Sequence, residues 1–595
     1  MAPIVTLVAL AFSLLPASFS SPVTSLSLHK STPALPLGLW RKLREREARA
    51  AGGSVGEAIT GGAQTIFGVE DIGFQAYEFD QLVSHDPLVP APYPNATFKQ
   101  SFCARRYWFD ATYYKPGGPV FFLDGGETDG EGRLPFLKEG ILRILSEATG
   151  GIGVVHEHRY YGTSHPVKNL TTDSLRYLTT LQSLHDSAYF AQNIVFPGFE
   201  DRDLTSANNK TAWIYYGGSY AGAKSAFARK LFPETWWGAI ASSAVTTAVI
   251  DFWEYMEVSP DLFCLTSIPL ISLSAQPIRL SGPPLCISLL QNHTIAIDAL
   301  LSLNNALITS TLKSYFGLGG ITLDTDFVNA LQMPLGSWQA RNWDADVGSR
   351  EFFNFCEKIE EGELEPESLV GAEGEGVLGK AMMNLGFPNP MKRFQSFKSY
   401  AAYVKEEIAS MCPEEDGEQD ECFGTSVYVG EGLEEAPWRS WSYQFCTEWG
   451  YYMGAPPEGL PSLISKFITT DYTGQICKIA FPKGKINRVP NSPNVTEINQ
   501  WGSYDFSYPR LAFIDGSEDP WLYATPHSPH RINSAREDTI SEPFKLIAGG
   551  VHHWDENGRL DGELPIVIKK VHKEEVAFVK EWMKEWRERG RWRPE

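Results

Sequence analysis

A serine, an aspartate and a histidine of this sequence each stand just beyond a short apolar run. They are Ser219, Asp519 and His552, in the stretches YYGGSYAGA, DGSEDPW and GGVHHWD. A serine hydroxyl becomes a strong nucleophile only when a base takes its proton, and a histidine can do so near neutral pH. A buried aspartate would fix the imidazole tautomer and stabilise the imidazolium. Together these three residue types can attack a carbonyl carbon and form an acyl-serine intermediate.

The residues around Ser219 are those that a sharp strand-to-helix turn requires. Residues 212–216 predict a buried strand, and the small residues at 223–227 favour a helix. The two glycines before the serine, and Ala221 and Gly222 after it, leave room for neighbouring backbone. Because Ala221 stands where the G-x-S-x-G pattern has its second glycine, a plain tight turn or a phosphate cradle is the alternative for this stretch alone.

The chain order serine, aspartate, histidine is typical of the α/β-hydrolase fold. Apolar runs that read as strands alternate with helical segments, which predicts a parallel α/β sheet whose chemistry lies beyond the carboxyl ends of its strands. The predicted strands are residues 119–123, 153–155, 212–216, 238–242, 510–514 and 544–548, preceded by antiparallel strands at 79–81 and 98–108. Helices are expected at residues 178–193 and 566–587.

The nucleophile and the acid are 300 residues apart (519 − 219), which leaves room for a large insertion. A chain of 595 residues also exceeds the roughly 250–300 residues at which a single core stops growing. Residues 293–312, 349–361 and 396–411 have helical spacing with charged faces. We therefore expect an α/β-hydrolase domain, residues 63–250 and 455–595, with a helical cap domain, residues 251–454, inserted between nucleophile and acid.

One segment, residues 259–285, does not fit the pattern of the cap. It is rich in Ser, Pro and Leu, has only Asp261 and Arg279 as charged residues, and interrupts a helix that would otherwise run from residue 251 into ISLLQNHT. We interpret it as a disordered loop or as a translated intron. A Gly/Glu-rich loop is expected at residues 361–376.

The N-terminal residues predict export. Residues 1–20 have an apolar core followed by small residues, as in a secretory signal peptide, although no Lys or Arg precedes that core. Residues 21–62 read as a propeptide or flexible lead, or as a short amphipathic helix that packs on the body. The eight cysteines are an even number, and Cys412 and Cys422 bracket an acidic loop that favours a local disulfide. N-glycosylation is expected at the five sequons, Asn95, Asn169, Asn209, Asn292 and Asn494.

Charge and missing motifs argue against several function classes. The 51 basic and 72 acidic residues give a net charge of -21, which argues against a nucleic-acid or anionic-membrane partner. No run after the signal reaches the roughly 18 apolar residues of a membrane span, so no stable membrane anchor is expected. HExxH does not occur, and His156 and His158 lack a third ligand at a recognisable spacing, so neither a metal nor a cofactor is expected. A homodimer stays possible.

An acyl-transfer site also needs donors for the negatively charged oxygen of its transition state. The N–H of Tyr220, directly after the serine, is one expected donor, and the N–H of Gly126, in the turn DGGE, is the expected second. An ordinary turn at a strand end is the alternative for the DGGE stretch. The adjacent His552 and His553 leave a choice, since either imidazole could reach Asp519.

These features occur together with several longer motifs. They are FKQSF and GGPVFFLDGGE within residues 98–127, EHRYYGTSHP (157–166), YLTTLQSLHD (177–186), GGSYAG (217–222), WSYQFCTEWGYY (441–452), DGSEDPW (515–521) and GGVHHWD (549–555). In this order, and over about residues 75–590, the sequence resembles the prolyl serine peptidase family of lysosomal Pro-X carboxypeptidase, dipeptidyl peptidase II, thymus-specific serine peptidase and fungal acid prolyl endopeptidases.

The resemblance implies roles for individual residues. Ser219 would be the nucleophile, Asp519 the acid and His552 the base, with His553 as a neighbour that tunes it. The family hydrolyses bonds on the carboxyl side of proline, so the implied substrates are proline-containing peptides or proteins, with the helical insertion over the cleft. Together with the signal peptide, the resemblance implies a secreted or a vacuolar (lysosomal) protein.

The substrate contacts implied by the resemblance are less defined. Trp521 would wall the apolar pocket for proline or, equally, pack in the core, and Glu127 and His553 would contact the substrate. The sequence identifies no charged residue that would bind a free end of a peptide.

The sequence also departs from the pattern of the family. Ala221 stands where the family commonly has glycine, Trp554 where an aliphatic residue often follows the histidine pair, and SHD (84–86) where the family has Asp-His-Phe. These departures leave exopeptidase and endopeptidase action open. The alternative functions are an esterase or lipase on the same fold, and an inactive hydrolase fold used for binding.

Overall fold

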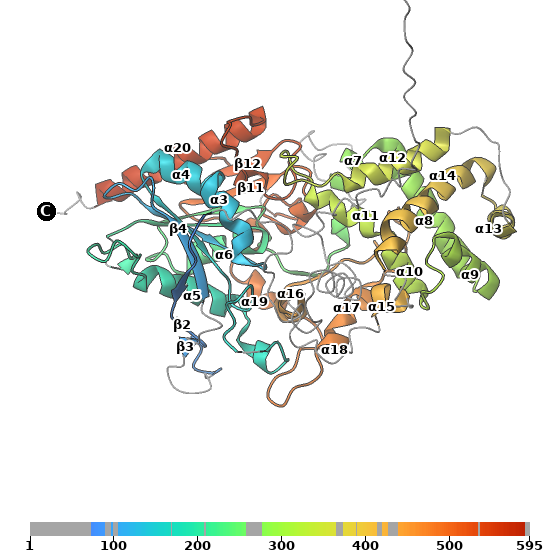
Figure 1. The fold of residues 1–595 in the computed structure, drawn as a ribbon, viewed down its shortest axis with the longest axis horizontal. Helices are drawn as coiled ribbons and strands as arrows, with labels where there is room; N and C mark the ends of the chain where they lie inside the picture. Colours follow the sequence, from blue (N-terminus) through green and yellow to red (C-terminus); the bar gives the residue numbers. More distant parts are fainter. Residues whose placement is uncertain are drawn as a thin grey trace, which may run out of the picture.

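The computed structural model describes residues 73–89, 97–98, 105–167, 169–207, 210–257, 277–364, 373–387, 390–412, 419–425, 438–532 and 536–589. Within these residues, a sheet flanked by helices and a mainly helical region occupy different halves of the molecule (Figure 1). The helical region is formed largely by residues between the strand that leads to the serine and the last two strands of the sheet. It is therefore an insertion into the α/β unit.

In the described part of the chain, eight strands form the central sheet in the order β1-β4-β6-β5-β7-β8-β11-β12. They are β1 (Tyr77–Phe79), β4 (Arg105–Asp110), β5 (Val120–Asp124), β6 (Ile152–His156), β7 (Trp213–Gly218), β8 (Gly238–Ser242), β11 (Leu511–Gly516) and β12 (Phe544–Ile547). The strands from β6 to β12 in this order are parallel, whereas β4 is antiparallel to both β1 and β6. The predicted α/β sheet is confirmed, and the short strands β2 (Gln81–Leu82) and β3 (Thr97–Phe98) pair beside it.

Alternate residues of the buried strands face different helices. In β5, Val120 and Phe122 belong to one hydrophobic cluster with residues of α5 (Thr180–Asn193) and α6 (Ser219–Leu231). Phe121 and Leu123 of the same strand belong to a second cluster, with α3 (Leu134–Lys138), α4 (Ile141–Thr149) and α20 (Ile566–Arg589). Because successive side chains of a strand point to opposite faces, the two sets of helices cover the two faces of the sheet. Figure 1 shows α3, α4 and α20 together on one side.

The helical cap begins and ends at one pair of strands. β9 (Val249–Asp251) and β10 (Gly450–Tyr452) pair in parallel, so the chain leaves and rejoins the hydrolase unit at one place. The helices between them are α7 (Pro277–Ser281), α8 (Pro284–Ser302), α9 (Ala306–Tyr315), α10 (Asp324–Leu331), α11 (Met333–Gly336), α12 (Glu351–Leu364), α13 (Glu373–Asn384), α14 (Pro390–Tyr403), α15 (Gln419–Phe423) and α16 (Trp438–Gln444). Three short helices follow before β11, namely α17 (Thr470–Gly474), α18 (Ile476–Ala480) and α19 (Val495–Asn499). The α/β-hydrolase fold with a helical cap between Ser219 and Asp519 is therefore confirmed.

Helix α8 is a core helix of this cap. It is long and apolar enough to cross a membrane by length and composition, but 61% of its apolar window is buried inside the protein. It also carries Cys286, whose disulfide to Cys356 joins it to α12. These two observations place its apolar residues within the packing of the cap.

Two expected helices of the cap differ in the structure. Residues 251–257 do not form one, because Asp251 ends β9 and pairs with Tyr452 of β10, and only a short 3₁₀ helix (Trp253–Tyr255) follows. The helix expected at 293–312 is broken after α8, where the side chain of Asn305 accepts hydrogen bonds from the first N–H groups of α9. Long-range strand pairing at Asp251 and the N-capping of α9 by the Asn305 side chain therefore override the helical spacing of the sequence at these two places.

The expected interruption at residues 259–285 is partly structured. Its last nine residues, 277–285, form α7 and begin α8, and Arg279 in α7 pairs with Glu257 at 2.6 Å. Residues 259–276 lie outside the described residues. In the loop expected at 361–376, the first four and the last four residues instead belong to α12 and α13.

Three disulfides join described residues, and one of them is the predicted local bridge Cys412–Cys422. The others are Cys286–Cys356 and Cys446–Cys477, whose partners are 70 and 31 residues apart. The sequons at Asn169 and Asn494 are exposed and Asn292 is half-buried. Asn95, Asn209 and the predicted signal peptide lie outside the described residues.

Candidate active site

Ser219 is held in a strained turn between β7 and α6. Its φ of 58° lies in the left-handed region that side chains other than glycine rarely adopt. A Cβ atom on Gly217 would lie 2.1 Å from the carbonyl oxygen of Ala221, and one on Gly222 would lie 2.6 Å from that of Ser242. The close approaches of backbone thus occur at Gly217 and Gly222. Ala221 fits beside them, which explains why the turn accommodates the departure from G-x-S-x-G.

Asp519 and His552 are brought together beyond the ends of β11 and β12. Asp519 Oδ2 lies 2.8 Å from His552 Nδ1, and Asp519 Oδ1 accepts the N–H of Trp521 at 2.9 Å. Both side chains are buried, with 0% of Asp519 and 6% of His552 exposed. Because Nδ1 of His552 contacts the aspartate, Nε2 is the ring nitrogen that can take a proton from a serine.

The surroundings of His552 favour its protonated form. Burial alone would lower the pKa of His552, but the charge and hydrogen bond of Asp519, with smaller contributions from Glu127 and Glu556, raise it above its ordinary value. A raised pKa makes the imidazole a stronger base once it is neutral. It also means that a reaction that needs neutral His552 slows as the pH falls below that pKa.

The structure resolves the choice between the two adjacent histidines. His553 does not contact Asp519: its Nδ1 lies 3.1 Å from Glu556 Oε2, and its N–H donates to the Ser243 hydroxyl at 2.9 Å. The two imidazole rings lie 4.4 Å apart between centroids. A Cβ on Gly218 would lie 2.4 Å from Glu556 Oε1, so the His553–Glu556 pair lies against the turn before the nucleophile.

The DGGE turn lies beside the serine, but its first two N–H groups already have acceptors. The N–H of Gly125 donates to the carbonyl of His156 at 2.8 Å, and that of Gly126 donates to Asp124 Oδ1 at 2.9 Å. A Cβ on Gly126 would lie 3.4 Å from the Cβ of Ala221, which places the turn against the start of α6. The expectation that Gly126 is the second oxyanion donor therefore needs correction, because its N–H is bonded to a carboxylate. The next N–H of the turn is that of Glu127.

The Glu127 side chain is a second feature of this turn. Its Oε2 atom is buried and has no hydrogen-bond partner among the described residues. Its charge is also one of the smaller contributions that raise the pKa of His552. A buried carboxylate oxygen without a donor is costly unless a bound group supplies one.

Trp521 packs in the core, which was one of its two alternatives, and its role as a wall of a proline pocket stays a prediction. It is half-buried and packs against the aromatic side chains of Phe252, Tyr255 and Tyr451, with ring centroids 5.0 to 5.5 Å apart. Its ring centroid lies 6.2 Å from that of His552, and its indole N–H donates to Gln339 of the cap at 2.7 Å. The tryptophan therefore packs in the core, with its ring beside that of His552.

A buried ion pair beneath the site was not identified from the sequence. Lys224 of α6 and Asp124 at the end of β5 are both fully buried, with Lys224 Nζ 2.6 Å from Asp124 Oδ2. Although burial alone would raise the pKa of Asp124, Lys224 holds it well below its ordinary value. The hydroxyl of Tyr215 donates to the same oxygen at 2.8 Å. The pair fixes the DGGE turn to the nucleophile helix; its only sequence signal is a lysine among the small residues of that helix.

Three buried carboxyl groups lie behind the nucleophile turn, on Asp555, Glu556 and Glu575. Asp555 accepts hydrogen bonds from Tyr216 at 2.5 Å and Ser242 at 2.6 Å. Burial and the Glu556 charge raise the pKa of Asp555 to about 7. Burial, together with Asp555 and Glu556, raises the pKa of Glu575 well above its ordinary value. These shifts favour the neutral forms of Asp555 and Glu575 in the folded protein under acidic conditions.

We expect the melting temperature to fall as the pH rises from about 5 to 8. A carboxyl group with a pKa raised by folding stabilises the folded state below its unfolded pKa, roughly 4, and loses this contribution as the pH passes its folded pKa. Glu448 and Glu257, whose pKa values burial raises to about 8 and about 7, act in the same direction. Glu575→Gln is neutral at every pH, so its melting temperature is expected to change less over this range.

Scanning calorimetry of both proteins between about pH 5 and 8 measures this difference. Glu581→Gln is the matched control, because Glu581 is an exposed glutamate of the same helix, α20. A parent melting temperature that rises with pH would contradict the prediction. So would a Glu575→Gln profile that follows the control.

The remaining histidines of the early motifs have structural contacts. His158 contacts the Arg159 carbonyl at 2.7 Å and the Tyr220 hydroxyl at 3.1 Å, behind the nucleophile turn. His156 lies at the end of β6, with its ring centroid 4.5 Å from that of Phe190. In the described ranges, no group of three or more His, Cys, Asp or Glu side chains is arranged to hold a metal ion.

Comparison with known proteins gives the family. The sequence profile of the serine carboxypeptidase S28 family matches residues 94–271 and 377–572. A protein of Arthroderma benhamiae named "Probable extracellular serine carboxypeptidase" is 38% identical over 523 residues, which cover 86% of this chain and 68% of the relative. The serine protease vicPa of Bipolaris victoriae is 27% identical over 80% of this chain and 83% of its own. The mouse thymus-specific serine protease is 25% identical over 78% of this chain and 80% of its own. The chain is thus a serine peptidase that belongs to the serine carboxypeptidase S28 family.

Proposed function

We propose that this protein hydrolyses peptide bonds on the carboxyl side of proline, with Ser219, His552 and Asp519 as its catalytic triad. The observation that carries the mechanism is the 2.8 Å contact of Asp519 with His552. It is supported by the φ of 58° at Ser219 and by Glu556, which pairs with His553 and lies against Gly218, the residue before the serine. The disulfides, and the word extracellular in the name of the Arthroderma benhamiae relative, support a secreted or vacuolar location.

In the first half of the proposed reaction, Ser219 Oγ attacks the carbonyl carbon of the scissile bond while His552 Nε2 takes the serine proton. Asp519 holds the imidazole and stabilises the imidazolium that forms. As the tetrahedral intermediate collapses, the C–N bond breaks and His552 gives its proton to the leaving amine. The product of this half-reaction is an ester of Ser219 with the proline carbonyl.

In the second half, a water molecule attacks the ester carbon and loses a proton to His552. The C–O bond to Ser219 then breaks, the serine regains its proton, and the carboxylic acid product leaves. In both halves the oxyanion would be stabilised by the N–H of Tyr220 and by that of Glu127, since the N–H of Gly126 donates to Asp124. Removing one such donor typically costs about 10²-fold or more in kcat.

The proline preference is supported by the aromatic wall around Trp521. A pyrrolidine ring is apolar and rigid, and it has no N–H group to satisfy within a peptide, so an aromatic surface can bind it by burial alone. Trp521 presents this surface 6.2 Å from the His552 ring, between centroids. Glu127 supplies the complementary polar feature, because its buried Oε2 would accept a hydrogen bond from a substrate amine or amide.

The test is to incubate the purified full-length protein with one proline-containing peptide whose ends are free, N-blocked or C-blocked. Mass spectrometry would locate the cuts, with Ser219→Ala as the inactive control. We expect cleavage after proline that is lost in the control. Cleavage of simple acyl esters without cleavage of the peptides would favour an esterase, and no turnover of either substrate by folded protein would favour an inactive binding protein.

The three end-blocked peptides also define the mode of action. Loss of cleavage on C-blocking would identify a carboxypeptidase, loss on N-blocking a dipeptidyl peptidase, and cleavage of all three an endopeptidase. If Glu127 binds a free amine, Glu127→Gln should raise KM for the peptide with a free N-terminus by about tenfold and leave KM for the N-blocked peptide nearly unchanged. An equal effect on both peptides would contradict this role.

A further inference from the structure

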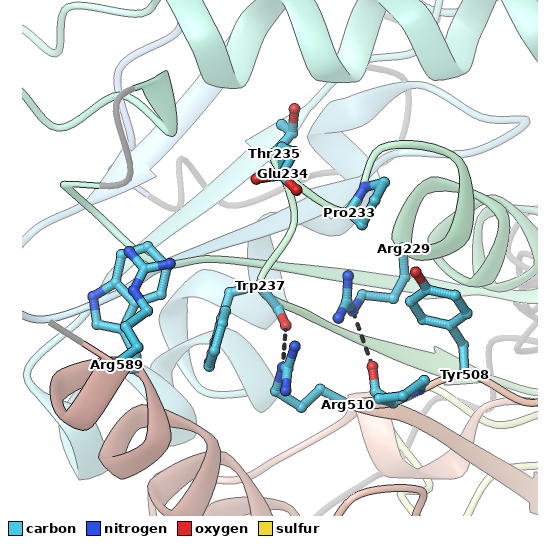
Figure 2. Close-up of a pocket in the computed structure, with 10 residues that line it drawn as sticks. Arg229, Pro233, Glu234, Thr235, Trp237, Tyr508, Arg510 and Arg589 are labelled. Carbon is cyan, nitrogen blue, oxygen red and sulfur yellow. Dashed lines mark hydrogen bonds between the residues drawn. The ribbon is translucent and has the colours of Figure 1, made fainter. Parts of the chain in front are cut away.

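A cavity lies on the opposite edge of the sheet from the catalytic residues. Its volume is about 270 Å³, and it is lined by residues of α6 and α20 and of the segments before β8 and β11 (Figure 2). Trp237 directly precedes β8 and Arg510 directly precedes β11, so the cavity is at the amino ends of these parallel strands. Ser219 and Asp519 lie beyond the carboxyl ends of the strands, so the cavity is separate from the active site.

Three arginines line this cavity, and each is held in place by an aromatic ring. The guanidinium carbon of Arg229 lies 4.9 Å from the ring centroid of Tyr508, that of Arg510 lies 3.8 Å from Trp237, and that of Arg589 lies 3.0 Å from Trp586. Two of the arginines are also fixed by backbone carbonyls. Arg229 Nε donates to Pro509 at 3.1 Å and Arg510 Nε donates to Trp237 at 2.9 Å, the dashed bonds of Figure 2.

The positive charge of this cavity is not balanced by its own walls. Glu234 is the only acidic side chain among the described lining residues, and it is exposed. Glu585 pairs with Arg510 at 3.2 Å, but it is not part of the lining. The cavity therefore combines three guanidinium groups with one carboxylate, in a chain whose net charge is -21.

Arg229 has an unmet hydrogen-bonding need in addition to its charge. It is only 3% exposed, and its Nη1 atom is buried without a hydrogen-bond partner among the described residues. Burial and the neighbouring Arg510 lower the pKa of Arg229 to about 10. Burying a guanidinium nitrogen without an acceptor is costly, so a bound anion would relieve a cost that the fold otherwise carries.

We propose that this cavity binds a tetrahedral oxyanion, phosphate or sulfate, either free or as a monoester. The planar fork of a guanidinium group matches the oxygen spacing of such anions, and three forks held by aromatic rings are preorganised for one. At roughly 30 Å³ for each water molecule, the cavity has the room of about nine waters, which accommodates the anion with part of an attached alcohol.

The three arginines belong to, or directly precede, elements of the hydrolase fold, two of which lead to or begin at residues of the proposed triad. An anion bound by all three therefore connects these elements. Arg229 is on α6, the helix that begins at Ser219, and Arg510 directly precedes β11, the strand that leads to Asp519. Arg589 is the last residue of α20, which packs on the other face of the sheet from α6. An anion that contacts all three stabilises the folded protein by a free energy that grows with the logarithm of the anion concentration once this exceeds Kd.

The test uses the full-length Ser219→Ala protein, so that it does not depend on peptidase activity. Isothermal titration calorimetry near neutral pH would measure the binding of inorganic phosphate, sulfate and glycerol 3-phosphate, with chloride at matched ionic strength as the reference. We expect saturable one-site binding of phosphate or sulfate and a higher melting temperature at saturation. Binding of glycerol 3-phosphate as well assigns the site to the phosphate group in esters, and binding of the free ions alone limits it to those.

Two substitutions in the lining act in opposite directions. Arg589→Gln should weaken binding by about tenfold, because it removes a charged donor, whereas Glu234→Gln should tighten binding because it removes the opposing charge. Arg587→Gln is the matched control, since Arg587 is an exposed arginine of the same helix that does not line the cavity. The proposal is overturned if phosphate and sulfate show no saturable binding at about 10 mM. It is equally overturned if Arg587→Gln weakens binding as much as Arg589→Gln.

Discussion

Asp519→Asn is expected to lower kcat by about 10⁴-fold while leaving the protein folded. The carboxylate of Asp519 accepts a hydrogen bond from His552 Nδ1 at 2.8 Å, which leaves Nε2 as the nitrogen that takes the serine proton in the proposed mechanism. An asparagine amide can present an N–H to Nδ1 and so stabilise the other tautomer, in which Nε2 carries a proton and cannot act as a base. The loss should appear in kcat for peptide hydrolysis rather than in KM.

The pH profile separates this role from a structural one. Because Asp519 contributes to the raised pKa of His552, the residual activity of Asp519→Asn should have its acid limb at a lower pH than the parent. The matched control is Asp515→Asn, since Asp515 is a buried aspartate of β11, the strand that leads to Asp519, and contacts His527 at 2.6 Å instead of His552. A control that loses as much kcat, or an acid limb that does not move, would contradict the assignment.

Lys224→Met is expected to destabilise the protein by about 3–5 kcal/mol, enough to reduce the yield of folded protein. The substitution leaves Asp124 buried and charged without the ammonium group that lies 2.6 Å from it. Because Asp124 also accepts the N–H of Gly126, the DGGE turn should loosen together with the nucleophile helix. Unfolding in urea, followed by circular dichroism, measures the change in the free energy of unfolding.

The surface pair Lys210–Asp203 provides a control for this effect. Its atoms lie 3.1 Å apart, but the Lys210 side chain is 60% exposed, so Lys210→Met should change the free energy of unfolding by less than about 1 kcal/mol. Adding Asp124→Asn to Lys224→Met should recover part of the lost stability, because the unpaired charge is removed. A double substitution that is additive with respect to its two single substitutions would contradict a direct interaction between Lys224 and Asp124.

The sequence alone determined the α/β class, most of the buried strands and the short segments that carry Ser219, Asp519 and His552. These features depend on neighbours along the chain. Apolar runs form strands buried on both faces, and small residues permit the sharp turn at the serine. The predicted bridge Cys412–Cys422 is of the same kind, because its partners are 10 residues apart and a short loop keeps them close.

The features that the sequence did not determine depend on residues that meet only in the folded chain. Whether His552 or His553 contacts Asp519 depends on the turn at His553, whose φ is 38°, and on the buried Glu556 that takes the second imidazole. The sequence predicts the N–H of Gly126 as an oxyanion donor, but in the structure this N–H donates to the Asp124 carboxylate. The sequence does not show this, because Asp124 is positioned by Lys224, 100 residues away.

Tertiary structure alone also decided the limits of the cap helices and the arginine cavity. Asp251 lies in a strand because β10, about 200 residues later, pairs with β9 and overrides the helical spacing of the sequence there. Arg229, Arg510 and Arg589 have no common motif, and only the packing of α6, α20 and the segment before β11 brings them to one cavity. Local propensity therefore determined which segments form strands and turns. Long-range burial and charge pairing decided which of their side chains meet. The free energies of burial and charge pairing exist only once distant segments are in contact, so the local sequence does not reveal them.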